Sequence, residues 1–143
     1  MGSGFATEVR VRFAETDAQG IAHHAAYVVW FEVARIEYLE RFRGGYKELQ
    51  AEGIEALTLD VQVTYRAPAR FDDRLTIYSR CADVRGARFR FEYRVERDGE
   101  LVATGSTGHA CADARTLRPT RVPEWLREEI SAAEAAGSAS SSS

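Results

Sequence analysis

The sequence predicts an α+β domain in which a curved, antiparallel, five-stranded sheet wraps around one long central helix. Residues 25–42 carry apolar side chains at helical spacing, whereas several later segments alternate apolar and polar residues with the period of a strand. The apolar stripe of the helical segment is wide, which indicates that a sheet covers it. One mostly apolar helix followed by consecutive strands is therefore the architecture that we expect.

The first elements are a strand and the long helix. Val9, Val11 and Phe13 alternate with charged residues, which predicts a half-buried strand. A loop that contains Gly20 follows, and a glycine pair at 44–45 ends the helix. The apolar stripe of the helix consists of Tyr27, Phe31, Ala34, Tyr38 and Phe42.

The rest of the chain has the pattern of strands joined by turns. Alternation with a period of two predicts strands over 57–65, 75–81, 88–96 and 101–112. The dipeptide Asp98-Gly99 is a strong hairpin signal between the last two of them. Residues 46–53 form a short polar connection, and Pro123 is expected to open a short terminal helix.

The chain of 143 residues is expected to form one domain over residues 7–126. We expect residues 1–6 and 132–143 to be disordered ends, the second because it is a low-complexity run of small residues. A curved sheet of this kind has exposed edges. Pairing with a second copy of the chain is therefore expected.

Composition and charge argue against several classes of function. A formal net charge of −3 disfavours a nucleic-acid partner. No apolar run approaches the roughly 20 residues that cross a bilayer, and the first residues do not resemble a secretory signal. Cys81 and Cys111 lack metal-like spacing. A disulfide between them stays open, but reduced thiols in a cytoplasmic protein are the preferred interpretation.

The segment from Asp17 to His24 carries the chemistry. It places one carboxylate in a glycine-containing loop directly before a helix start, where free N–H groups and the positive end of the helix dipole lie. Asp17 alone is most simply a helix cap or a turn residue. A carboxylate that faces oriented amide donors is also suited to attack on a carbonyl with stabilisation of the oxyanion.

Several motifs resemble the signature of hotdog-fold acyl-CoA thioesterases. They are FAETDAQG at 13–20, HAAY at 24–27, WFEVAR at 30–35, YRAPARFDD at 65–73 and VRG at 84–86. The nearest subgroup is the 4-hydroxybenzoyl-CoA thioesterase type, including the short-chain enzymes associated with the Tol–Pal system. The resemblance extends over roughly residues 7–126 and favours catalysis over a cap for Asp17.

The resemblance implies a hotdog fold, a dimer or tetramer, and active sites at the subunit interface. It also implies hydrolysis of an acyl-CoA thioester to acid and coenzyme A, with no metal and no cofactor besides the coenzyme A of the substrate. The catalytic carboxylate falls on Asp17 and the oxyanion donor on the main-chain N–H of His24. Asp17 either attacks the carbonyl or deprotonates a water molecule, and the His24 side chain either takes part or only orients the site.

Further residues are expected to bind the substrate. Gly20 permits close approach of the backbone to a ligand. The main chain at Ala22 and His23 adds N–H groups to that of His24. We expect Tyr27 and Phe31 to form walls of the acyl pocket.

Other candidates lie further along the chain. Thr58 is expected to face a partner's site. Arg85, and next to it Arg88, are candidates for the coenzyme A phosphates, because guanidinium groups match phosphate geometry. The competing interpretation of both arginines is solvated surface.

Two other functions stay open from the sequence. The natural substrate could be an acyl-carrier-protein thioester of a fatty-acid or polyketide pathway, which would use the same site. The chain could instead be a non-catalytic module that binds acyl-CoA. The absence of a visible output domain and the presence of Asp17 argue against that module.

Overall fold

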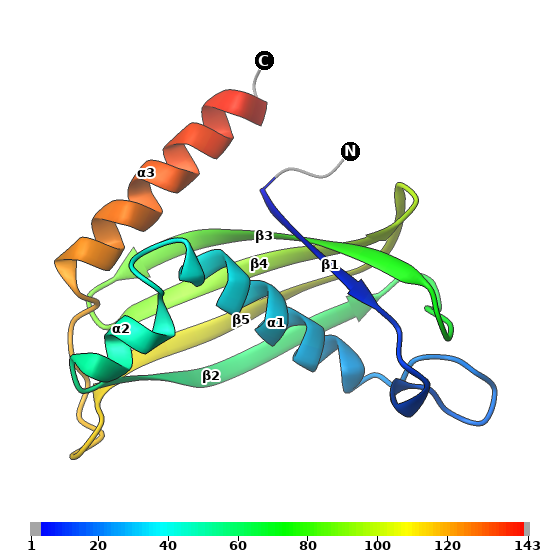
Figure 1. The fold of residues 1–143 in the computed structure, drawn as a ribbon, viewed down its shortest axis with the longest axis horizontal. Coiled ribbons are helices and arrows are strands. Elements are labelled where there is room, and N and C mark those ends of the chain that lie inside the picture. Colours follow the sequence, from blue (N-terminus) through cyan, green and yellow to red (C-terminus); the bar gives the residue numbers. More distant parts are fainter. Residues whose placement is uncertain (1–3, 142–143) are drawn as a thin grey trace.

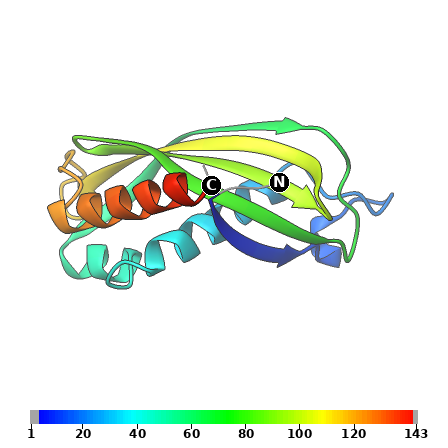
Figure 2. The same cartoon turned by 90° about the horizontal axis from the view of Figure 1, so that it is seen from above.

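The computed structural model describes residues 4–141 and contains one antiparallel sheet with the strand order β1-β3-β4-β5-β2. The strands are β1 (Phe5–Arg10), β2 (Ile54–Tyr65), β3 (Arg74–Arg85), β4 (Arg88–Arg97) and β5 (Glu100–Asp113). Helix α1 (Ala26–Glu40) lies against one face of this sheet (Figure 1). Figure 2 shows the sheet curving over the helix. The predicted fold class is confirmed.

The core lies between α1 and the sheet. The Phe31 ring stacks on Tyr93 of β4 with a centroid distance of 4.3 Å, and Tyr38 meets Phe91 edge to face at 4.9 Å. Gly105 of β5 makes this contact possible, because a Cβ there would lie 2.4 Å from the Phe31 ring. The aromatic stripe expected for the helix is thus the centre of the core.

The hairpin between β4 and β5 has the predicted turn. Asp98 and Gly99 both have positive φ values, +50° and +84°, as a type I′ turn requires. This turn sets the register in which Arg97 faces Glu100. Local sequence was sufficient to predict it.

The start of the chain differs from the prediction. Strand β1 begins at Phe5, inside the segment expected to be disordered, and ends at Arg10. Phe13 instead lies in the short 3-10 helix η1 (Phe13–Glu15), where its carbonyl accepts the N–H and the hydroxyl of Thr16. This local turn removes Phe13 from the sheet and leaves it 77% exposed.

The helices outside α1 also differ from the prediction. The segment expected as a polar connection contains α2 (Tyr46–Ala51), and α3 (Glu124–Ser141) replaces most of the disordered end expected from residue 132. Alanine-rich sequence favours helix strongly, so low complexity did not mean disorder here. Helix α3 buries Leu126 and Ile130, and Glu134 accepts hydrogen bonds from the Tyr38 hydroxyl and the Cys81 N–H. Residues 1–3 and 142–143 of the predicted ends lie outside the described residues.

The helices of the described segment, residues 4–141, are too short or too polar for a membrane crossing.

Candidate active site

Asp17 lies in a closed loop at the end of the molecule where α1 begins. Thr16 and Ala22 pair across the base of this loop. The Asp17 N–H donates to the Ile21 carbonyl at 2.9 Å, and the Gly20 N–H donates to the Asp17 carbonyl at 3.0 Å. Gly20 has a φ of +77°, which few other residues adopt without strain. The glycine therefore closes the loop that holds the carboxylate.

The Asp17 carboxylate is exposed and ionised. Its Oδ1 accepts the N–H of Gln19 at 2.8 Å and that of Ile21 at 3.2 Å. These hydrogen bonds lower the pKa of Asp17 below its ordinary value. Within residues 4–141, Oδ2 has no hydrogen-bond partner. One oxygen thus fixes the loop and the other remains free for chemistry.

Main-chain N–H groups near the helix start divide into occupied and free donors. The Ala22 N–H donates to the Ala69 carbonyl and the His23 N–H to the Glu15 carbonyl, both at 2.8 Å. The expectation that Ala22 and His23 supply free donors is therefore wrong. Among the described residues, the N–H groups of His24 and Ala25 have no partner. The structure thus leaves the expected oxyanion donor, His24, available.

A cavity of about 290 Å³ lies beside these donors. Tyr27 lines it, and its ring meets that of Tyr65 at the end of β2 edge to face at 4.9 Å. The His24 ring stacks on the Tyr65 ring at 4.4 Å, and the Tyr65 hydroxyl donates to the His24 carbonyl at 2.9 Å. The remaining lining residues are Ile21, Ala22, His24, Arg66, Ala67 and Pro68.

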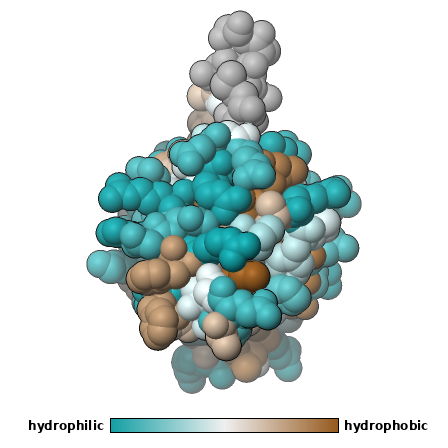
Figure 3. Space-filling model, turned by 90° about the vertical axis from the view of Figure 1, so that its right-hand side faces the viewer, coloured by the Kyte–Doolittle hydropathy of each residue, from teal (hydrophilic) through white to brown (hydrophobic). Residues whose placement is uncertain are grey.

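The loop end of the molecule has exposed hydrophobic side chains. Figure 3 faces this end and shows patches of hydrophobic surface among hydrophilic side chains. Phe13 and Phe71 meet edge to face at 5.8 Å and are 77% and 53% exposed. The Phe71 N–H donates to the Gly20 carbonyl, which ties this aromatic pair to the Asp17 loop.

Glu15 and Tyr65 support the site, although neither was predicted to have a role. The buried Glu15 carboxylate accepts the Arg12 N–H, the Arg12 guanidinium and the Trp30 indole N–H at 2.8–3.1 Å. Burial by itself raises the pKa of Glu15, but these hydrogen bonds outweigh it and leave the pKa lowered. Glu15 therefore joins the loop to α1. Two signals in the sequence could have indicated these roles. Glu15 directly precedes Thr16 and Asp17, and Tyr65 stands at the end of a predicted strand.

Phe31 and Thr58, two of the predicted residues, lie away from this cavity within the chain. Phe31 has no exposed surface and packs in the core, so the expectation that it lines this pocket is wrong. Thr58 lies on the β2 edge and contacts His109 Nδ1 at 3.3 Å. The buried His109 has its pKa lowered to about 3, mainly by burial, so it is a neutral core histidine.

Arg85 and Arg88 face each other across the turn between β3 and β4. The other end of β3, at Arg74, pairs with Arg10 just before the Asp17 loop. The length of β3 separates the two ends by roughly 35 Å at 3.3 Å per residue, and Figure 1 shows them at opposite ends of the sheet. One chain therefore does not bring Arg85 to Asp17.

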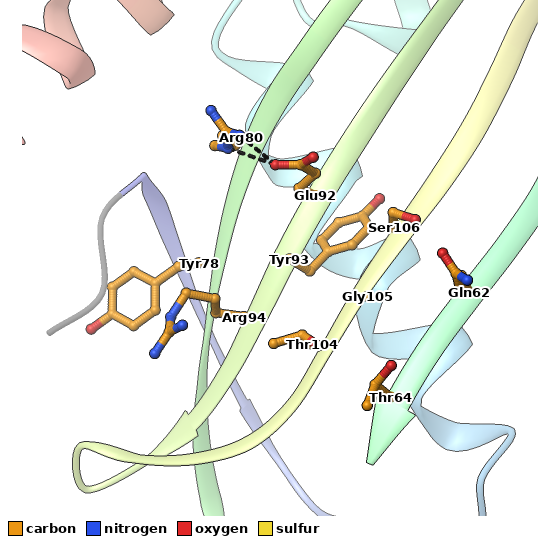
Figure 4. A pocket seen from close by; sticks show the side chains of 10 residues that line it. All are labelled: Gln62, Thr64, Tyr78, Arg80, Glu92, Tyr93, Arg94, Thr104, Gly105 and Ser106. Atoms are coloured by element: carbon orange, nitrogen blue, oxygen red, sulfur yellow. Dashed lines mark hydrogen bonds and ion pairs between the residues drawn. The ribbon is translucent and has the colours of Figure 1, made fainter. Parts of the chain in front are cut away.

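Another hollow of about 360 Å³ lies on the face of the sheet away from α1 (Figure 4). Its walls are polar, and they include the ion pair between Arg80 and Glu92. It contains none of the predicted site residues. The cavity lined by His24 and by Ile21 of the Asp17 loop is thus the better candidate for catalysis.

Comparison with known proteins identifies the family of the chain. The family model of the thioesterase-like superfamily matches residues 11–130. The chain belongs to this superfamily. Its fold is accordingly the hotdog fold, and the chain is a thioesterase.

Individual proteins are similar to this chain over nearly its whole length. The acyl-CoA thioester hydrolase YbgC of Escherichia coli is 33% identical over 88% of this chain and 95% of its own length. A hypothetical protein of Thermus thermophilus, TT1821, is 38% identical with a TM-score of 0.83 and covers 90% of this chain and 98% of its own. A DHNA-CoA thioesterase of Staphylococcus aureus is 28% identical with a TM-score of 0.84 over 96% of both chains.

Proposed function

We propose that the chain hydrolyses acyl-CoA thioesters, with Asp17 as the catalytic carboxylate and the His24 N–H as the oxyanion donor. One observation supports this proposal above the others. An ionised carboxylate with a free oxygen and a free N–H at the helix start occupy the same short segment beside a cavity. The similarity to YbgC, whose name states acyl-CoA thioester hydrolysis, supports the choice of substrate.

The proposed reaction adds water across the C–S bond. Asp17 either attacks the acyl carbon to give a mixed anhydride that water then cleaves, or takes a proton from the water that attacks. In both routes the C–S bond breaks, the thiolate leaves and takes up a proton, and the products are the free acid and coenzyme A. The His24 N–H would hold the carbonyl oxygen as it becomes negative, an effect of about 3–4 kcal/mol for one such donor.

The reaction so described needs no metal or cofactor, because the carboxylate, water and main-chain donors supply its chemistry. We place it in the cytoplasm. Cys81 and Cys111 are both buried free thiols, as is usual in a reducing compartment.

A second copy of the chain completes the proposed site. Strand β2 ends the sheet, and its open edge carries exposed Leu59 and Val61 beside exposed Val29 and Val33 of α1. Pairing two β2 strands antiparallel about a two-fold axis buries this apolar surface. It also brings the far end of one sheet to the Asp17 end of the other. Thr58, Arg85 and Arg88 would then serve the partner's site.

A thiol-release assay over acyl-CoA thioesters of different length and aromatic character tests the reaction. We expect Asp17→Asn to lower kcat by roughly 10²–10⁴ while the loop stays intact, because the amide oxygen can still accept the Gln19 N–H. Asp98→Asn is the control, since this residue lies in a hairpin turn that asparagine tolerates. Near-normal turnover by Asp17→Asn would remove Asp17 from its role. If the chain cleaves carrier-protein thioesters but no acyl-CoA, the substrate is bound to a carrier protein and not to coenzyme A.

Light scattering after gel filtration tests the second copy. Leu59→Asp places a charge on the β2 edge and is expected to yield a monomer with reduced turnover. Ala82→Asp, an exposed position on β3, is expected to leave the assembly unchanged. A wild-type monomer with full activity would contradict the shared site.

A further inference from the structure

Within residues 4–141, the buried Arg35 of α1 has no acidic partner. The residue is 7% exposed, and among the described residues its guanidinium donates hydrogen bonds only to the hydroxyls of Tyr46 at 3.0 Å and Tyr93 at 3.2 Å. Burial raises the pKa of both tyrosines, so neither supplies a negative charge at neutral pH. No carboxylate of residues 4–141 lies within salt-bridge distance of Arg35.

This arrangement is costly because Arg35 is buried. Several more exposed arginines have acidic partners, such as Arg10 with Asp72 at 2.6 Å and Arg90 with Asp60 at 2.9 Å. A buried guanidinium stays charged at all ordinary pH values. Removing that charge from water without a counter-ion costs several kcal/mol. The fold therefore holds a desolvated cation that an anion would stabilise.

The free side of Arg35 faces a cavity. Arg35 Nη2 has no hydrogen bond within the described residues. The fully enclosed side-chain atoms without a partner are Thr7 Oγ1 and Ser79 Oγ, so Nη2 is unpartnered but not fully enclosed. Arg35 lines a cavity of about 460 Å³ between α1, α2 and β2. That volume lies within the range of about 300–1,000 Å³ found for small-molecule sites.

We propose that this cavity binds the carboxylate of a small organic acid, with Arg35 as its anchor. The rim also carries Glu32, Glu40 and Glu55, but these side chains are exposed and their charges are screened by water. The buried guanidinium of Arg35 is shielded from water, so its positive charge dominates the inner part of the cavity. A carboxylate there accepts charge-assisted hydrogen bonds from the guanidinium.

The site is separate from the catalytic loop of the same chain. Arg35 lies nine residue steps after Ala26 along α1, which corresponds to about 13 Å along the helix. The carboxylate has two possible sources. It is either a free acid or the far end of a dicarboxylic acyl group that is bound at the partner's site across the β2 edge. The second source rests on the proposed function, because the cavity includes Thr58 of that edge.

The first test is a titration followed by amide-resolved NMR with butyrate and with butyramide, its uncharged analogue. We expect butyrate to shift the amides around Tyr46 and butyramide to have little effect. Arg35→Met should weaken butyrate binding at least about tenfold. Equal effects of the two compounds, or unchanged affinity in a folded Arg35→Met, would overturn the proposal.

A second variant covers the case in which Arg35→Met does not fold. Gln50→Trp fills the cavity from an exposed position of α2 and should abolish the butyrate effect. Ala51→Trp, also exposed on α2 but not part of the lining, is the matched control and should bind normally. Normal binding by Gln50→Trp would place the butyrate elsewhere.

The kcat/KM ratio of glutaryl-CoA to pentanoyl-CoA separates the two sources. A wild-type preference for glutaryl-CoA that falls in Gln50→Trp identifies the acyl end as the ligand. A ratio near one together with butyrate binding identifies a free acid. If neither thioester is cleaved, the proposed function fails while the butyrate titration still decides the carboxylate site.

Discussion

Replacing Glu15 with glutamine tests whether this buried carboxylate joins the Asp17 loop to α1. Both carboxylate oxygens accept hydrogen bonds: Oε1 from the Arg12 N–H at 2.8 Å, and Oε2 from the Arg12 guanidinium at 3.0 Å and the Trp30 indole at 3.1 Å. An amide keeps one oxygen and turns the other into a donor. In either orientation of the glutamine amide, its NH2 group then faces an N–H donor of Arg12 or Trp30.

The cost of Glu15→Gln follows from that conflict. Leaving one buried donor without a partner costs about 1–3 kcal/mol. For a chain of this size the loss corresponds to roughly 3–10 °C in Tm. Turnover should fall as well, because the main-chain carbonyl of residue 15 accepts the His23 N–H. A shift of residue 15 therefore also displaces the main chain that leads to His24.

Thermal unfolding followed by circular dichroism at two pH values measures this cost. The hydrogen bonds lower the folded pKa of Glu15. The stabilisation is therefore complete above the unfolded value of about 4.3 and is lost as the pH falls through the lower folded value. The gap between wild type and Glu15→Gln should be full at pH 7 and shrink below about pH 4. Glu8→Gln, an exposed position of β1, should change stability by less than about 0.5 kcal/mol. A Glu15→Gln variant that melts like Glu8→Gln, or a gap that widens in acid, would refute the reasoning.

Two further outcomes concern the core. Gly105→Ala should lose about 1–3 kcal/mol of unfolding free energy, measured in urea, because its Cβ would lie 2.4 Å from the Phe31 ring. Gly108→Ala should lose less, because its Cβ would meet the movable side chains of Asp60 and Arg90. Equal losses in the two variants would contradict this. His109 has a folded pKa of about 3, so wild-type stability should fall with pH below about 6.5 by up to 1.4 kcal/mol per unit from this group. In His109→Gln that part of the slope should disappear, and an unchanged pH profile would show that folding does not lower the pKa of His109.

Local patterns were enough to predict α1, the Asp98-Gly99 turn and the loop at Asp17. Each depends on residues close together in the chain. The same patterns placed Phe13 in a strand, because alternation does not reveal that Thr16 captures its carbonyl. They also placed Phe31 at a pocket wall. The apolar stripe of a helix does not show which of its side chains packs in the core, as Phe31 does against Tyr93.

The parts of the site that the sequence did not show depend on distant partners. The Ala22 N–H is occupied by a carbonyl from Ala69, and His24 is held by the Tyr65 hydroxyl. Nothing in the loop itself signals these contacts. For the same reason the separation of Arg85 from Asp17 became visible only when the course of β3 was known.

The docking of α3 gives the protein a built-in chemical reporter. Cys81 lies beneath this helix with an N–H bonded to Glu134, and burial raises the pKa of its thiol to about 12. A maleimide reagent reacts with thiolate and needs access, so labelling of Cys81 would proceed only when α3 detaches. The labelling rate then measures how often α3 leaves its place on the sheet, without any engineered probe.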